Sequence, residues 1–144
     1  MPSDPRHGRV PPQNIEAERS TLGCCLMGVE PLVKVTAYLE PDDFYEPAHQ
    51  MIYEAMTTLV KANRPVDSIT VSDELEKAGQ LEEAGGLSYI AALPDAAPSF
   101  TAAMDYAEIV RNKAQIRRLI TALDRVMEAS FNEEADSDSL IDLA

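Results

Sequence analysis

The longest uninterrupted stretch of helix-forming sequence runs from Thr101 to Phe131 and contains neither Pro nor Gly. Such a stretch predicts one long helix, about 45 Å in length at 1.5 Å per residue. A helix of that length exceeds the width of a compact domain of 144 residues. We therefore expect part of it to project from the domain.

The apolar residues of this stretch recur in alternating steps of four and three, close to a period of 3.5. That period is typical of a helix packed lengthwise on another helix. Two interpretations are open: a core helix with a solvated back, or an arm that pairs with a second helix or subunit. The row comprises Ala102, Tyr106, Ile109, Ile116, Ile120, Leu123 and Met127, with Lys113 at the one polar position. On the second interpretation, Ile109, Ile116, Ile120, Leu123 and Met127 form a subunit interface.

Composition favours helices and argues against strong binding to duplex DNA. Hydrophobic residues make up 45% of the chain and aromatic residues 6%, with no Trp, so the core is built from aliphatic side chains and Met. The net charge is −13, whereas duplex DNA binders are usually basic. Arg111, Arg118 and Arg125 are spaced seven residues apart on the opposite face of the long helix. A solvated helix face is the favoured interpretation of these arginines, and a weak nucleic-acid or partner strip is the alternative.

The order of breaks along the chain predicts three parts. Residues 1–13, with four prolines, are expected to form a disordered arm, residues 14–99 a helical globular domain, and residues 100–144 the long helix and the start of a helical hairpin. Leu140, Ile141 and Leu143 begin a new apolar pattern that the end of the sequence cuts off. The expected fold is therefore all-α, a small multi-helix globule followed by a long helix that starts a truncated hairpin.

Local signals place the individual helices. Asn14 is expected to cap the first helix, in which Gly23 suggests a close neighbour because glycine otherwise weakens a helix interior. Thr70 with Asp73 resembles a capping box. A later short helix is expected to end at Pro94.

The chain offers little for catalysis or cofactor binding. Gly23 to Gly28 has the glycine spacing of a phosphate loop, but Lys and Ser/Thr do not follow and the segment lies in an amphipathic helix. Cys24 and Cys25 are adjacent, so they do not suit a disulfide and are expected to be free thiols in a reducing compartment. His7 and His49 have no ligand-like neighbours. We expect a non-enzymatic domain without metal, cofactor or membrane span, in the cytoplasm, that works through protein contacts.

Five segments in order resemble the N-terminal domain of the bacterial replicative DNA helicase family DnaB. The first, Pro12 to Gly23, is similar to the family's P-x-N-x-E-A-E-x-S-V-L-G, with Thr21 in place of the usual Val. The others are Asp43-Phe44-Tyr45 with His49 and Ile52-Tyr53; Pro65-Val66-Asp67 with Thr70-Val71 and Leu75; Gly79 to Tyr89; and Tyr106 to Val110 with Arg117 to Ile120. Phe100 to Ala103 departs from the family's usual residues before the Tyr-Ala pair.

The resemblance implies a role in DNA replication. It implies a collar domain of a ring-shaped hexameric helicase, in which hairpins pair between subunits to form a trimer of dimers and primase docks. It implies that ATP, Mg and most contacts with single-stranded DNA belong to a C-terminal domain outside this chain, which drives 5′–3′ unwinding. A helicase loader is a further candidate partner. The alternatives are the helicase-binding C-terminal domain of a primase and an unrelated acidic helical adaptor.

Overall fold

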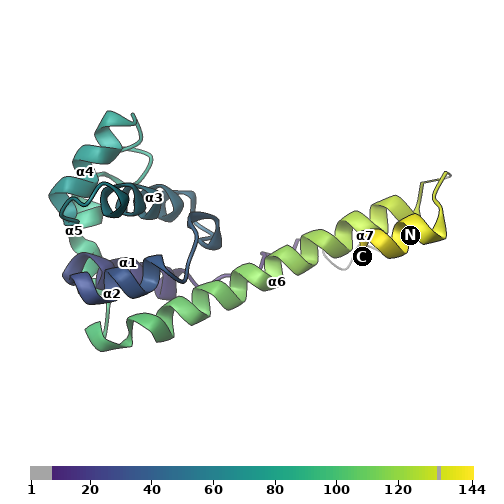
Figure 1. Cartoon of the computed structure of the whole chain (residues 1–144), viewed down its shortest axis with the longest axis horizontal. Coiled ribbons are helices and arrows are strands. Elements are labelled where there is room, and N and C mark those ends of the chain that lie inside the picture. The colour runs from purple at the N-terminus through teal and green to yellow at the C-terminus, as the bar shows by residue number, and fades with distance from the viewer. Residues whose placement is uncertain (1–7, 133) are drawn as a thin grey trace. The chain divides into compact units, whose positions relative to one another are not determined.

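The computed structural model describes residues 8–132 and 134–144, so much of the arm expected at residues 1–13 lies outside the described residues. Within the described ranges the chain is helical and has no strand. The predicted all-α class is thus confirmed, including the long helix and the start of a hairpin. The helices are α1 (Ile15–Met27), α2 (Val29–Thr36), α3 (Pro47–Lys61), α4 (Ser68–Lys77), α5 (Gly86–Ala96), α6 (Ala103–Ser130) and α7 (Ser137–Leu143), with 3-10 turns η1 (Pro41–Asp43) and η2 (Phe100–Ala102) (Figure 1).

The chain divides into two compact units. The globular unit is Gln13–Ala114, and the hairpin unit comprises Gln115–Ala144 together with the N-terminal segment up to Pro12. Helix α6 therefore contributes its first part to the globular unit and the remainder to the hairpin unit. The boundary predicted between residues 99 and 100 separates a domain expected to fold independently from the long helix that follows it. This boundary stays a prediction.

The core of the globular unit forms where α1 packs against α5 and α3. Its largest fully buried side chains include Leu22, Phe44, Ile52, Tyr53 and Met56. A Cβ atom added at Gly23 would lie 2.9 Å from the carbonyl carbon of Leu93 in α5, and closer still to its oxygen. The close neighbour expected at Gly23 is thus confirmed, because only a residue without a side chain lets α1 and α5 approach this far.

Helix ends follow some of the sequence signals and depart from others. The Asn14 side chain accepts a hydrogen bond from the backbone N–H of Ala17 at 3.0 Å, which confirms it as the cap of α1. The capping box predicted at Thr70 is wrong by three residues: Asp67 is the cap, and Thr70 closes the box from inside α4. The end predicted at Pro94 is also wrong, since α5 continues to Ala96. The helical chain runs through Pro94, and the N–H of Ala97 bonds to the Pro94 carbonyl at 3.3 Å.

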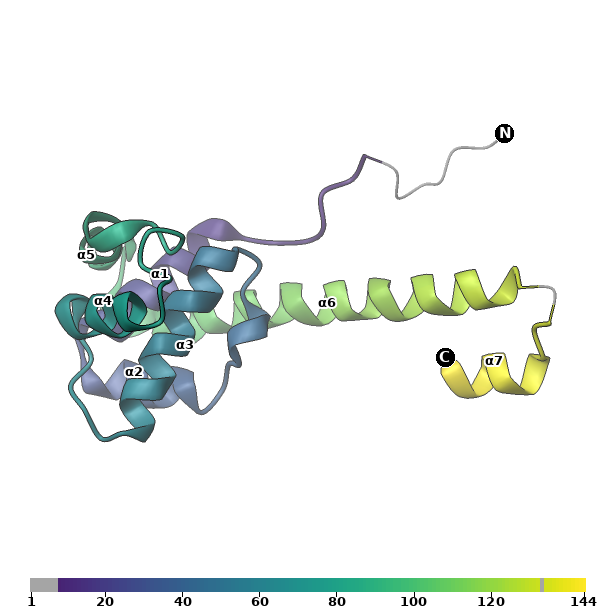
Figure 2. The same cartoon turned by 90° about the horizontal axis from the view of Figure 1, so that it is seen from above.

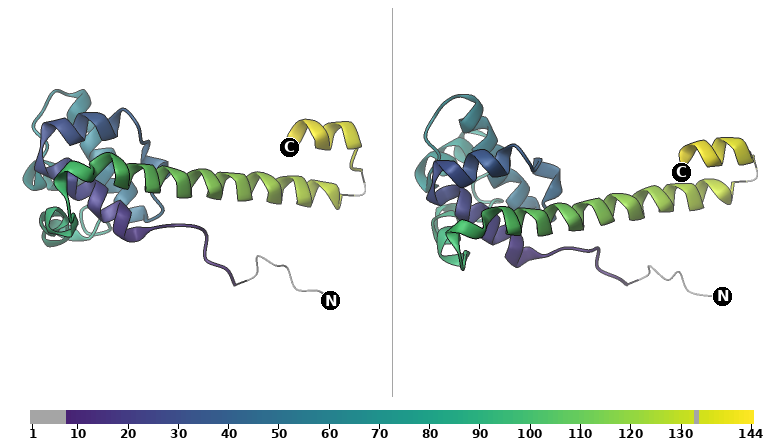
Figure 3. Two further views of the ribbon diagram at one scale, coloured as in Figure 1. Left: turned by 90° about the horizontal axis from the view of Figure 1, so that it is seen from below. Right: turned by 60° about the horizontal axis from the view of Figure 1, so that its bottom comes forward.

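The hairpin unit contains the later part of α6 and the short helix α7, which turns back beside the end of α6 (Figures 2 and 3). The Asp136 side chain caps α7 by accepting from the N–H of Ser139 at 3.3 Å. Leu140 of α7 is half-buried, as are Val126 and Ala129 of α6, whereas most neighbours are exposed. These partly covered side chains mark the inner side of the hairpin.

Candidate functional site

Helix α6 uses its smallest side chains to pack within the globular unit. Its buried residues are Ala103, Ala107, Val110 and Ala114, again in steps of four and three. Small residues let the helix backbone approach its neighbours closely. The larger apolar row predicted from the sequence lies on another face of α6. Because an α-helix turns about 100° per residue, the mean direction of the row is roughly 140° around the helix axis from that of the buried residues.

The row predicted as a subunit interface remains uncovered by the described chain. Its members have exposed fractions of 38% for Ile109, 36% for Ile116, 36% for Ile120, 56% for Leu123 and 47% for Met127. Ile109 belongs to the globular unit and the other four to the hairpin unit. Single exposed apolar residues are common, but a continuous row at a 3.5-residue period is typical of a surface that another helix covers. We call these five residues the apolar row.

The three arginines predicted as a strip have different surroundings. Arg111 donates a hydrogen bond to the carbonyl of Tyr38 at 3.3 Å, and its guanidinium carbon lies 4.7 Å from the Tyr38 ring centroid. This cation–π contact fixes Arg111 inside the globular unit. Arg118 also makes an interaction, and Arg125 is exposed. Arg111 and Arg118 each follow a buried alanine of α6 by four residues, so they continue the packing face of the helix.

A buried polar network joins three helices of the globular unit. The Glu18 carboxylate of α1, 1% exposed, accepts hydrogen bonds from the backbone N–H groups of Tyr45 at 2.7 Å and Glu46 at 3.3 Å. It also lies 2.8 Å from Nδ1 of His49, whose Nε2 is 2.6 Å from the Tyr89 hydroxyl of α5. Glu18 thereby holds the start of α3, where the helix dipole favours an acid.

The sequence patterns did not indicate this network, because the residues that pair in it are 27 to 40 positions apart along the chain. From the sequence, Glu18 is identified only as part of the first family segment, and His49 has no ligand-like neighbour along the chain. A signal was nevertheless present: Glu18, His49 and Tyr89 come from three of the five segments that carry the family resemblance. The side chains of Glu18, His49 and Tyr89 all have partners, so the network ties α1, α3 and α5 together.

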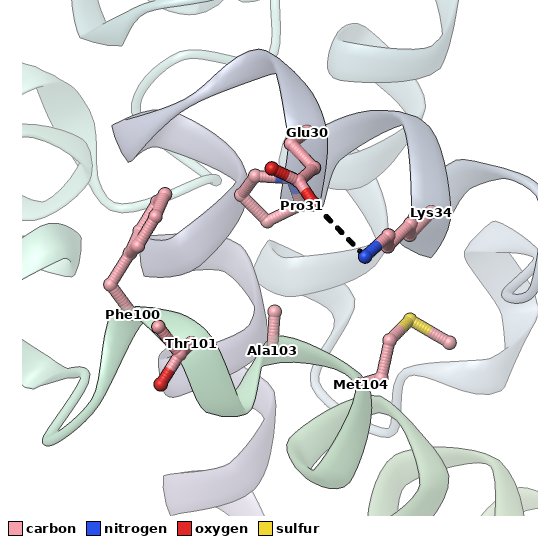
Figure 4. A pocket seen from close by; sticks show the side chains of 7 residues that line it. All are labelled: Glu30, Pro31, Lys34, Phe100, Thr101, Ala103 and Met104. Atoms are coloured by element: carbon pink, nitrogen blue, oxygen red, sulfur yellow. Dashed lines mark hydrogen bonds and ion pairs between the residues drawn. The ribbon is translucent and has the colours of Figure 1, made fainter.

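Two hollows open on the globular unit. One, of about 290 Å³, lies over the exposed side of Tyr89, between Arg19, Glu46 and Gly85. The Tyr89 hydroxyl raises the pKa of Arg19, chiefly through a hydrogen bond, so this wall of the hollow keeps its positive charge. The second hollow, of about 140 Å³, lies between α2 and the start of α6 (Figure 4). Phe100 and Met104 line it, beside the 3.1 Å ion pair of Glu30 and Lys34.

Neither hollow gathers side chains that could hold a metal ion, although each has a cationic side chain on its wall, Arg19 in the first and Lys34 in the second. Among the described residues, no three side chains of His, Cys, Asp or Glu gather closely enough to bind a metal ion. No helix in the described ranges combines the length and the apolar character that a membrane crossing requires. The second hollow is instead bordered by Phe100, which is 40% exposed, and by Met104.

Comparison with known proteins shows the family. The model of the DnaB-like helicase N terminal domain matches residues 10–112. This chain belongs to that family. Its membership excludes the primase domain and the unrelated adaptor that the sequence alone left open.

Relatives of this DnaB-like domain are longer proteins. The replicative DNA helicase DnaB of Geobacillus stearothermophilus is 41% identical over 136 residues, which cover 94% of this chain and 30% of that protein. The chain thus spans about a third of the length of the curated relatives it matches. The crystal structure of the N-terminal domain of DnaB helicase from Mycobacterium tuberculosis matches with a TM-score of 0.87 and 37% identity, over 92% of this chain and 94% of that one.

A further solved structure is that of a DnaB-like replicative helicase and its interactions with primase. It is similar to this chain with a TM-score of 0.69 and 28% identity, over 80% of this chain and 27% of that one.

Proposed function

We propose that this chain is the collar and oligomerisation domain of a hexameric, ATP-dependent replicative DNA helicase, and that it pairs with other copies through the apolar row. The observation that carries the proposal is the exposure of all five members of the row, each between 36% and 56%. Family membership supports the helicase context. In this proposal two α6 helices lie lengthwise against each other, and three such dimers form the ring.

Pairing requires hydrophobic association to exceed charge repulsion. Each chain has a net charge of −13, so two copies repel each other at low salt. The row itself lacks acids, and burial of each large apolar side chain contributes about 1.5–3 kcal/mol when it is complete. Self-association should therefore strengthen as salt screens the repulsion, with a Debye length falling to about 10 Å at 0.1 M.

The test is the double substitution of Ile116→Asp and Ile120→Asp, with mass measured by analytical ultracentrifugation. We expect weaker self-association with an unchanged helical circular-dichroism spectrum. The matched control replaces Gln115 and Thr121 by Asp, which adds the same charge on exposed positions of α6 that face away from the row. If both variants lower the oligomer mass equally, the effect is one of charge and the pairing surface lies elsewhere.

We also propose primase as a partner, because a similar helicase structure has been described with its interactions with primase. Mixing this chain with purified primase and measuring the mass of the assembly tests it directly. A helicase loader is a second candidate, and the same measurement with a loader distinguishes the two. Absence of any complex with primase at high micromolar concentration would remove this part of the proposal.

The chemistry of unwinding is proposed to lie outside this chain. ATP, Mg and the main contacts with single-stranded DNA would belong to a further domain of the complete protein, acting in the cytoplasm. Arg111, Arg118 and Arg125 are retained as a weak secondary contact for nucleic acid or partner. Any binding of single-stranded DNA by this chain should fall steeply with salt, which is the opposite of the trend expected for pairing.

A further inference from the structure

The N-terminal segment Gly8–Pro12 belongs to the hairpin unit, although it directly precedes α1 in the chain. We call this segment the strap. Pro11 and Pro12 have no backbone N–H, and their rings fix φ near −65°, so the last two residues of the strap are stiff and offer backbone carbonyl acceptors without backbone donors. A segment of this kind can be held through its carbonyl groups by a side chain that only donates.

Arg117 supplies that donor. Its Nη1 donates to the carbonyl oxygen of Pro12 at 2.8 Å, across 105 residues of sequence. Between Gln115 and Leu123, Arg117 is the one residue that is partly covered, and Pro12 is partly covered as well, whereas Pro11 is exposed. Arg117 is therefore more covered than its neighbours on α6, and Pro12 is more covered than Pro11.

The position of this bond in the chain is distinctive. The chain passes between its two units twice, between Pro12 and Gln13 and inside α6 between Ala114 and Gln115. The Arg117–Pro12 hydrogen bond joins residues that lie within a few positions of both passages. The strap is thus attached to α6 by a hydrogen bond close to the two points where the chain changes unit.

We propose that Gly8–Pro12 is a strap that Arg117 holds on α6, and that this bond restrains α6 where the chain passes from one unit to the other. A guanidinium donating to a carbonyl is charge-assisted, and the two prolines reduce the freedom that the strap loses when it is held. The strap also flanks the apolar row, since Arg117 directly follows Ile116. The inference does not depend on the row pairing with a second copy.

Hydrogen exchange tests the restraint. Arg117→Ala should speed amide exchange in residues 113–121 roughly three- to tenfold, as expected for loss of one charge-assisted hydrogen bond. Arg117→Lys should retain part of the protection, because ammonium also donates but lacks the planar fork. The control Arg125→Ala removes the same charge from an exposed position of the same helix and should leave residues 113–121 unchanged.

A double-mutant cycle separates the strap from effects of Arg117 within α6. A chain that begins at Gln13 should show the same faster exchange as Arg117→Ala, and adding Arg117→Ala to it should change nothing further. All variants are measured in the Ile116→Asp, Ile120→Asp background as well, so that self-association does not contribute. The proposal is overturned if Arg117→Ala matches Arg125→Ala, or if its effect persists undiminished in the chain without the strap.

Discussion

Gly23→Ala is the substitution for which the structure gives the sharpest expectation. In an isolated helix, alanine is favoured over glycine by about 1 kcal/mol, so sequence propensity alone predicts a more stable protein. Here the added methyl group would lie 2.9 Å from the carbonyl carbon of Leu93 and 3.2 Å from Cα of Pro94. Both atoms are backbone of α5, so relief requires α1 and α5 to separate and not merely a rotation of a side chain.

Overpacking of a core typically costs about 1–3 kcal/mol, and rigid backbone at the contact favours the upper part of that range. After subtracting the gain in propensity, we expect a net loss of about 2 kcal/mol in the free energy of unfolding. Since urea m-values for small domains are about 1–3 kcal/mol/M, the midpoint of urea unfolding should fall by about 1 M. The control is Gly28→Ala, whose nearest neighbour is the end of the Phe100 side chain, which can move aside. A Gly23→Ala protein as stable as the parent would refute the close approach of α1 and α5.

Three further predictions concern the interior and the chemistry of the chain. Glu18→Gln should lower the free energy of unfolding by about 1–3 kcal/mol in urea titrations, because an amide NH₂ cannot accept from all three donors that surround the carboxylate; equal stability would mean that water replaces the lost acceptor. Burial raises the pKa of both Cys24 and Cys25, so at neutral pH the two thiols should react slowly with a disulfide reagent in the folded chain. In guanidinium, which unfolds the chain, both thiols should react completely. Fast labelling of the native protein would contradict their burial. The chain should not hydrolyse ATP, and protein-dependent turnover that survives repurification would contradict a non-catalytic role.

The sequence predicted most of the fold because its strongest signals are local. The uninterrupted stretch before Phe131 became α6, and Asn14 became the cap of α1. The signal at Thr70 failed for a local reason too: Asp67, three residues earlier, is a better cap and uses Thr70 as its partner. Pro94 also failed as a boundary, since α5 runs through it to Ala96 without the backbone N–H that proline lacks.

Contacts between distant residues could not be predicted in the same way. Nothing in the spacing of Glu18, His49 and Tyr89 indicates that they meet, because the distances between them along the chain are set by the intervening loops. Likewise, periodicity identified an apolar face of α6 but not that smaller residues on another face would do the packing. An alanine contributes little apolar area, so a helix face that is buried through alanines gives only a weak signal in the hydrophobic periodicity of the sequence.

The two faces of α6 have different roles in the proposed assembly. Its alanines, Ala103, Ala107 and Ala114, are buried within the globular unit and leave the larger aliphatic residues uncovered. Apart from the Nε of Arg19, the side-chain polar atoms buried in the described part of the chain have hydrogen-bond partners, as in the bonds of Glu18 with the start of α3. What remains available for binding is therefore apolar surface, which gives association its free energy. Between Ile109 and Arg125 this surface is accompanied by five basic residues and one acid, Asp124. A partner that covers the row must bring a matching apolar helix, and a second copy of this chain meets that requirement.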